Sequence, residues 1–350
     1  MMMFVVSSTG TKSRKTVILL SVLVVIASVA GAWAWQQRGS RTAKTPKLKP
    51  LPKSAPIDGD KAMAILKQIC DMGPRISDTP AMKKQQEFLK DHFEKLGAKV
   101  TMQEFPGKHP LKGGVTLANM IVEFNPESTE RILICCHYDT RPYPMMDPDY
   151  NIRTKEGVFL GANDGAAGVA LLCEMGRAIG GIKCKYGIDF VFFDAEELIF
   201  NERTAISPGD PYCLGSEHFA IDYSSRPPKH KYKWGVLVDM IGDASLQLFQ
   251  EKNSMSWKDT RPLVKEIWGV AKKLGASEFI DRERHEVKDD HIPLHDKGGI
   301  PCCDIIDFDY PYPGADPQYW HTIQDSPDNC SGRSMALVGW VLIEWLKSVK

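Results

Sequence analysis

The sequence predicts an α/β protein in which helices flank a largely parallel sheet. Four compact runs are apolar on both faces, as strands buried inside a sheet are. These runs are residues 131–136, 188–193, 234–238 and 302–306. Two stretches with helical spacing of apolar residues, 165–179 and 260–274, lie between them. Strands that alternate with helices in this way indicate parallel pairing through helical crossovers.

The remaining elements follow from the same spacing rules. Helical spacing recurs in three further segments, 58–71, 79–96 and 334–349. Gly97 is a typical stop at the carboxyl end of the second of these. Short strands are expected at 99–105 and 119–124. The stretch 201–215 is typical of a loop, and because it follows a pair of adjacent glutamates we expect it to border the functional site.

Composition limits the classes of protein that fit. The chain has 350 residues and 43% hydrophobic content, with no composition break after the first 57 residues, so we expect one domain over 58–350. The formal net charge is zero, which argues against a nucleic-acid partner. Nine cysteines include no C-x2-4-C pair of the kind that binds zinc, and Cys135, Cys136, Cys302 and Cys303 are expected to be buried core residues.

The N-terminal segment predicts a membrane anchor. Residues 1–15 form a short basic tail, and residues 16–35 are uncharged and mostly apolar over a length that can span a bilayer. Residues 36–57, rich in Lys and Pro, are typical of a linker. We expect a signal anchor with the catalytic domain outside the cytoplasm. The alternative is a secreted protein, cleaved after the A-x-A site at 32–34.

Seven Asp, Glu and His residues form a candidate metal set, mostly at or just after the strand-like runs. They are His137, Asp139, Asp164, Glu196, Glu197, Asp239 and His321. An open α/β sheet presents its functional site at the carboxyl ends of its strands, which is the pattern seen here. Asp164 precedes a helix and could instead be an N-cap. Adjacent carboxylates after a buried strand repel each other without a cation, so one of the glutamates is expected to bind metal and the other to act as general acid/base.

Several acids near the C-terminus complete the candidate site. Asp289 and Asp290 precede His291, and Asp304 interrupts an apolar run, where a charge needs a partner. Trp320 beside His321 suggests an aromatic wall next to a ligand. Donors of the Asp, Glu and His type without a thiolate suit a catalytic zinc that keeps an open position. Serine nucleophile chemistry has less support, since the chain contains no G-x-S-x-G elbow.

Six motifs, taken in order, resemble the M28 zinc peptidase superfamily. They are H-Y-D, G-A-N-D-G, F-F-D-A-E-E, L-V-D-M-I-G, D-D-H-I-P and W-H-T-x-x-D, and the resemblance covers about 58–350. Within this superfamily the chain looks most like the glutaminyl cyclases. The resemblance implies a three-layer α/β/α fold with a central mixed sheet. It also implies Asp164, Glu197 and His321 as ligands of one zinc and Glu196 as acid/base. Asp239 and Asp289 would form a supporting network, and Trp320 and Asp304 would belong to the substrate pocket.

Two activities remain open. A cyclase would convert the N-terminal glutamine of peptides or proteins to pyroglutamate and release ammonia, using one zinc. An M28 aminopeptidase would use two zincs, and the resemblance implies His137 and Asp239 as ligands of the second. A binding domain that has lost catalysis is a third possibility. The contexts of Asp289 and His321 favour the cyclase, whereas Glu202, where animal cyclases have a pocket tryptophan, does not. Asp304 stands where they have a histidine. A monomer is expected.

Overall fold

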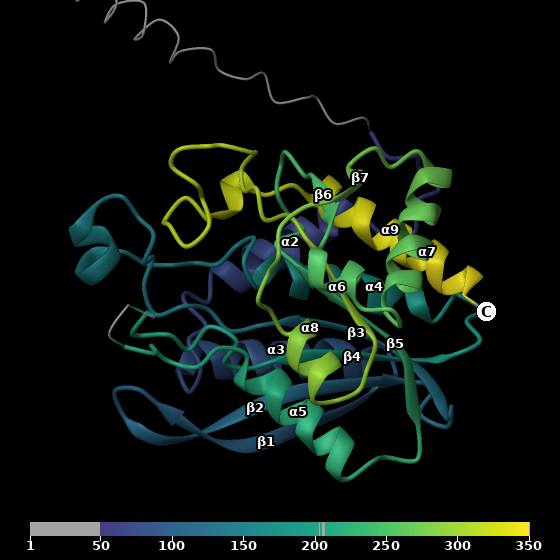
Figure 1. Cartoon of the computed structure of the whole chain (residues 1–350), viewed down its shortest axis with the longest axis horizontal. Helices are drawn as coiled ribbons and strands as arrows, with labels where there is room; N and C mark the ends of the chain where they lie inside the picture. Colours follow the sequence, from purple (N-terminus) through teal and green to yellow (C-terminus); the bar gives the residue numbers. More distant parts are fainter. Residues whose placement is uncertain (1–49, 203, 205–206, 350) are drawn as a thin grey trace, which may run out of the picture. The chain divides into compact units, whose positions relative to one another are not determined.

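The computed structural model describes residues 50–202, 204 and 207–349. Its α-helices, with the labels of Figure 1, are α2 (Gly59–Cys70), α3 (Pro80–Lys95), α4 (Ala166–Ile179), α5 (Leu214–Ser225), α6 (Lys252–Ser256), α7 (Arg261–Leu274), α8 (His291–Asp296) and α9 (Gly332–Ser348). Its strands are β1 (Lys99–His109), β2 (Gly113–Phe124), β3 (Glu130–His137), β4 (Gly187–Phe193), β5 (Lys231–Asp239), β6 (Leu248–Gln250), β7 (Phe279–Glu283) and β8 (Cys302–Ile306).

The central sheet has six strands in the order β1-β2-β4-β3-β5-β8. The four strands β4, β3, β5 and β8 pair in parallel. They coincide, within three residues at each end, with the four apolar runs of the sequence. The edge pair β1 and β2 is antiparallel, and β2 also pairs antiparallel with β4. The prediction of a largely parallel sheet is therefore confirmed, and the sheet is mixed.

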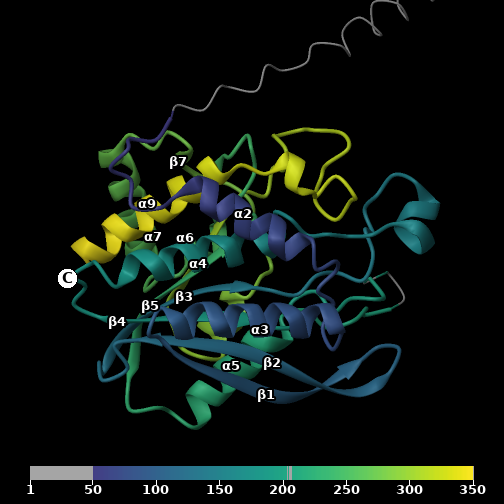
Figure 2. The same cartoon turned by 180° about the vertical axis from the view of Figure 1, so that it is seen from behind.

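Helices cover both faces of the sheet, which gives three layers. Alternate side chains such as Ile134 and Phe192 enter a large core under α2, α3, α4, α7 and α9. Their neighbours, among them Cys135 and Phe193, enter a smaller core under α5 and α8. Figure 1 shows α5 and α8 on the near side, and Figure 2, turned by 180°, shows α2, α3 and α9 on the other. The four cysteines expected in the core are buried.

Local sequence signals explain where the first helices begin and end. The Asp58 side chain accepts hydrogen bonds from the amides of the first turn of α2, and Thr79 caps α3 in the same way. Gly97 follows α3 with a φ of +80°, a conformation that glycine adopts without strain. Both helices match their predicted spans to within one residue at each end.

Two parts of the prediction need revision. Residues 214–225 form helix α5, whereas the sequence indicated a loop up to 215 and nothing beyond it. The helix was missed because its apolar residues follow no helical periodicity.

Leu51 and Ile57, at the end of the predicted linker, pack against the large core. The folded domain therefore includes residues that the linker assignment excluded.

The predicted anchor at 16–35 lies outside the described residues. Among the helices that the structure describes, none is long and apolar enough to cross a membrane.

Candidate active site

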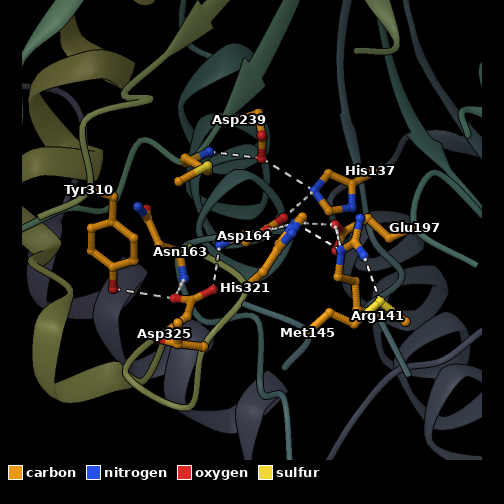
Figure 3. A network of polar contacts seen from close by, with 12 residues as sticks. His137, Arg141, Met145, Asn163, Asp164, Glu197, Asp239, Tyr310, His321 and Asp325 are labelled. Carbon is orange, nitrogen blue, oxygen red and sulfur yellow. Dashed lines mark hydrogen bonds and ion pairs between the residues drawn. The ribbon is translucent and has the colours of Figure 1, made fainter. Parts of the chain in front are cut away.

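The candidate residues come together where the parallel strands end. His137 is the last residue of β3, Asp239 is the last residue of β5, and Glu196 and Glu197 follow β4. The register pairs His137 with Phe193, so the turn after β4 lies beside the end of β3. Figure 3 shows His137, Asp164, Glu197, Asp239 and His321 directed toward one another.

Asp164, Glu197 and His321 form a buried group that could hold one metal ion. His321 Nε2 lies 2.7 Å from Glu197 Oε1 and 3.3 Å from Asp164 Oδ2. Donor atoms that share one tetrahedral zinc at about 2.0–2.1 Å lie about 3.3 Å apart. The distance between His321 Nε2 and Asp164 Oδ2 matches this spacing. Glu197 Oε1 lies closer and accepts a hydrogen bond from Arg141, so Oε2 is the Glu197 oxygen left for a metal. Asp164 Oδ2 and Glu197 Oε2 are buried with no hydrogen-bond partner among the described residues. The donor set therefore fits zinc both in chemistry and in its unpaired buried oxygens.

A second group shares Asp164 with the first. His137 Nε2 lies 3.1 Å from Asp164 Oδ1 and 3.2 Å from Asp239 Oδ1, and these three residues could also hold a metal ion. Asp164 thus has one oxygen toward each histidine. Burial opposes its ionisation, but the nearby imidazoles of His137 and His321 hold the pKa of Asp164 well below its usual range. Both candidate metal sets of the sequence prediction are assembled in the structure.

Asp139 has a different place from the one predicted. Its Oδ1 accepts the backbone N–H of Glu196 at 3.0 Å, and its Oδ2 accepts that of Glu197 at 2.9 Å. Both oxygens are thereby used to hold the turn that carries the two glutamates, and this turn begins at Ala195 with a φ of +56°. Asp139 belongs to none of the candidate metal groups among the described residues. Its inclusion among the metal ligands was wrong, because the side chain points at the next strand end.

Glu196 lies next to the two candidate metal-binding groups, and its own carboxyl favours the protonated form. Burial, and next the charge of Glu197, raise its pKa well above the usual value. Burial raises the pKa of Asp239 to about 6 and, together with the charge of Asp239, that of Asp289 to about 7. The Cys213 thiol donates to Glu196 Oε1 over 3.5 Å. The carboxyls of Asp239 and Asp289 can therefore exchange protons near neutral pH.

Asp325 fixes the loop that presents Asp164. Its oxygens accept the backbone N–H of Asn163 at 2.7 Å and of Asp164 at 3.1 Å. The N-cap of α4 is Gly165, which makes no side-chain cap, so Asp164 does not serve as the N-cap that the sequence left open. Gly165 has a φ of +97°, and a Cβ there would lie 2.9 Å from the Asp139 carbonyl oxygen. The only sequence signal for Asp325 is its place as the last residue of the W-H-T-x-x-D motif.

A small cavity of about 50 Å³ opens onto this cluster. Its walls combine the metal-binding and proton-transfer candidates with apolar side chains; the lining is Asp164, Glu196, Glu197, Tyr212, Asp239, Val287, Lys288, Asp289, Ile306, Phe308, Trp320 and His321. Trp320 lies on the wall as expected, and its ring stacks on His321 with centroids 3.7 Å apart.

Asp304 is not part of the wall, contrary to the prediction. It is 1% exposed, and its Oδ2 lies 3.9 Å from Nδ1 of His291. Glu251 Oε2 lies 3.3 Å from the other ring nitrogen of His291. Its position inside β8 turns the carboxylate into the protein, toward His291 and away from the cavity.

Sequence reasoning missed Arg141 and Tyr212. Arg141 is fully buried, and its Nε donates to Glu197 Oε1 at 2.8 Å, while its Nη2 donates to the Tyr212 hydroxyl at 2.6 Å. The available signal was its position four residues after His137, since a charged residue that close to a buried strand end needs a partner.

The family model described as peptidase family M28 matches residues 119–346. The chain belongs to peptidase family M28. The matched segment contains every candidate metal ligand and Glu196. The glutaminyl-peptide cyclotransferase of Bos taurus is 26% identical over 244 residues, which cover 61% of this M28 chain and 61% of that protein. The glutaminyl-peptide cyclotransferase of Drosophila melanogaster is 26% identical over 274 residues, 72% of this chain and 71% of that one. The M28 chain thus matches less than two thirds of the bovine relative's length.

Solved structures of both activities resemble the M28 chain. The glutaminyl cyclase of Fimbriiglobus ruber superposes with a TM-score of 0.78 at 39% identity, covering 89% of this chain and all of that one. A leucine aminopeptidase precursor of Bacteroides thetaiotaomicron superposes with a TM-score of 0.74 at 29% identity, covering 87% of this chain and all of that one.

Proposed function

We propose that this M28 protein is a zinc-dependent glutaminyl-peptide cyclotransferase, which converts the N-terminal glutamine of peptides or proteins to pyroglutamate and releases ammonia. The observation that supports this choice over peptide hydrolysis is Trp320, which forms one wall of the cavity and stacks on His321. The sequence context of these two residues favours a cyclase, and the cyclase of Fimbriiglobus ruber is 39% identical over nearly the whole chain.

Asp164, Glu197 and His321 would hold the zinc ion, which supplies a Lewis acid for the γ-carboxamide oxygen of the substrate glutamine. Trp320 and Phe308 line the cavity and would confine the glutamine side chain. Such confinement brings the α-amine and the γ-carbon of one residue together, so orientation supplies much of the rate enhancement.

Glu196 would transfer the proton. In its ionised form, whose basicity the raised pKa increases, the carboxylate would remove a proton from the α-amine as the nitrogen bonds to the γ-carbon and closes the five-membered ring. The same carboxyl returns the proton to the amide nitrogen as the carbon–nitrogen bond breaks and ammonia leaves. Asp239 and Asp289, whose pKa values burial raises to about 6 and about 7, would carry protons beside it without adding full negative charges.

A two-zinc aminopeptidase is the second candidate. His137, Asp164 and Asp239 lie close enough to hold another metal ion, and a leucine aminopeptidase precursor shares the fold. In that case Glu196 would act as general base toward water.

One assay separates the two activities. The purified protein, loaded with zinc, is incubated with Gln-Xaa and Leu-Xaa peptides, and the products are followed by ammonia release and mass spectrometry. A cyclase removes no residue from the Gln peptide, lowers its mass by that of one ammonia, and leaves the Leu peptide unchanged. Release of free leucine, with Gln peptides cyclised no faster than without protein, would reject the cyclase and support the aminopeptidase.

We also propose that residues 16–35 anchor the protein in a membrane with the catalytic domain on the extracytoplasmic side, as a monomer. Membrane fractionation with protease protection tests the anchor and its orientation. Appearance of a shortened protein in the medium would support the secreted alternative. Light scattering in detergent measures the oligomeric state.

A further inference from the structure

Arg141 is a buried cation that contacts the metal-binding group (Figure 3). It also contacts Glu202 and Tyr212, which form the rim of the site. Its side chain is 0% exposed. Its Nε lies 2.8 Å from Glu197 Oε1 and 2.9 Å from His321 Nε2. Its Nη1 donates to Glu202 Oε1 at 2.5 Å and its Nη2 to the Tyr212 hydroxyl at 2.6 Å. Nε of the guanidinium therefore faces the metal-binding group, and its two terminal nitrogens face Glu202 and Tyr212.

We propose that Arg141 is a positioning residue that holds Glu197 in the orientation needed for zinc, and that Glu202 and Tyr212 in turn hold Arg141. The inference rests on the zinc site of the proposed function and is independent of which reaction the protein catalyses.

The two oxygens of the Glu197 carboxylate have different surroundings, and this difference supports the proposed role of Arg141. Oε1 accepts the hydrogen bond from Arg141, while Oε2 is buried and has no hydrogen-bond partner among the described residues. A carboxylate fixed at one oxygen presents the other in a defined direction, so less rotational freedom is lost when a metal binds. Nε carries a single hydrogen and lies within hydrogen-bond distance of both Glu197 Oε1 and His321 Nε2. When a metal takes the lone pair of His321, that hydrogen is left for Glu197.

The second step is the attachment of Arg141 to the rim. The Tyr212 hydroxyl donates to Glu202 Oε2 at 2.9 Å and accepts from Arg141, which closes a triangle of hydrogen bonds. The Glu202 side chain is 39% exposed, whereas Arg141 is buried. A planar guanidinium with this many partners has one allowed orientation. The rim residues therefore determine where Nε lies relative to Glu197.

A simple role in charge balance makes the opposite prediction. If Arg141 acted only as a positive charge, it would repel a zinc ion a few ångströms away, and its removal would tighten zinc binding. If it positions Glu197, its removal frees the carboxylate and weakens zinc binding. The direction of the change in zinc affinity distinguishes the two.

The test is a zinc titration of the full-length, metal-free protein against a chromophoric chelator. Arg141→Gln should weaken zinc affinity by about 10- to 100-fold, the usual effect of losing a partner of a metal ligand. Arg141→Lys should restore part of it, since one ammonium can reach Glu197 but cannot bridge to the rim. Glu202→Gln and Tyr212→Phe, at partly exposed positions, should weaken it by a few-fold and keep the test valid if Arg141→Gln does not fold.

Arg177→Gln is the matched control, because Arg177 forms an ion pair with Glu174 on α4 and is not part of the cavity wall. Its zinc affinity should equal that of the unmodified protein. Unchanged or tighter zinc binding in Arg141→Gln would overturn the inference, as would unchanged affinity in both rim variants. Failure of the unmodified protein to bind zinc would instead count against the proposed function.

Discussion

Replacing Glu196 by glutamine tests the central chemical assignment. The substitution keeps the shape of the side chain, and the backbone N–H of residue 196 still donates to Asp139. The Cys213 thiol can still donate to the amide oxygen that takes the place of Oε1. The residues proposed to bind zinc are unchanged. The variant therefore loses proton transfer and little else.

The expected loss in kcat is about 10²- to 10⁴-fold, the usual contribution of a positioned general acid/base. It corresponds to about 3–5 kcal/mol in the activation barrier. Initial rates of ammonia release from a Gln peptide give kcat, and elemental analysis gives the zinc content, which should stay at the level of the unmodified protein. Glu197→Gln is the comparison and should lose zinc together with activity. A Glu196→Gln variant within about threefold of full activity, or one without zinc, would refute the assignment.

The remaining predictions concern stability. Burial raises the pKa of Asp243 to about 7, so this carboxyl contributes stability that is fully present below about pH 4 and is lost as the pH rises through 7. Asp243→Asn should therefore be more stable than the parent at pH 8 by on the order of 1–3 kcal/mol and show a flatter dependence of the melting temperature on pH; equal slopes in thermal melts would contradict this. Removal of zinc by a chelator should lower the melting temperature, because the ion binds the folded state alone, and no change on removal and re-addition would argue against a metal site at Asp164, Glu197 and His321.

Much of the fold was accessible from the sequence because buried parallel strands have a strong local signature. The segments around His137, Glu197 and Asp239 are apolar and compact, so their ends were predictable, and the ends of parallel strands meet at one edge of a sheet. Helix α5 could not be predicted from the sequence, because its burial is set by contacts on several sides and leaves no apolar stripe along the helix.

The site was predictable in its residue types and less so in their orientation. Alternation along an extended chain places His137 and Asp139 on one side, but β3 ends at His137, and Asp139 turns toward the amides after β4. Asp304 was expected in the pocket and faces His291 instead. Arg141 carries no motif, and its partners lie 56 and 61 residues away in the chain. The direction in which each of these side chains points depends on its three-dimensional neighbours, which one sequence does not reveal.

The sequence separations within the site have a consequence for synthesis and folding. Asp139 holds a turn 57 residues further on, and Arg141 meets His321 across 180 residues. Contacts between such distant segments form late, because loop closure opposes them until the surrounding sheet is in place. A nascent chain that ends between residues 306 and 320 has the strands of the central sheet and both glutamates but lacks His321, one of the residues proposed to hold zinc. The proposed zinc site is therefore complete only after residue 321 has been made and the strands that carry its other members have paired. Zinc binding would then report that the domain has folded.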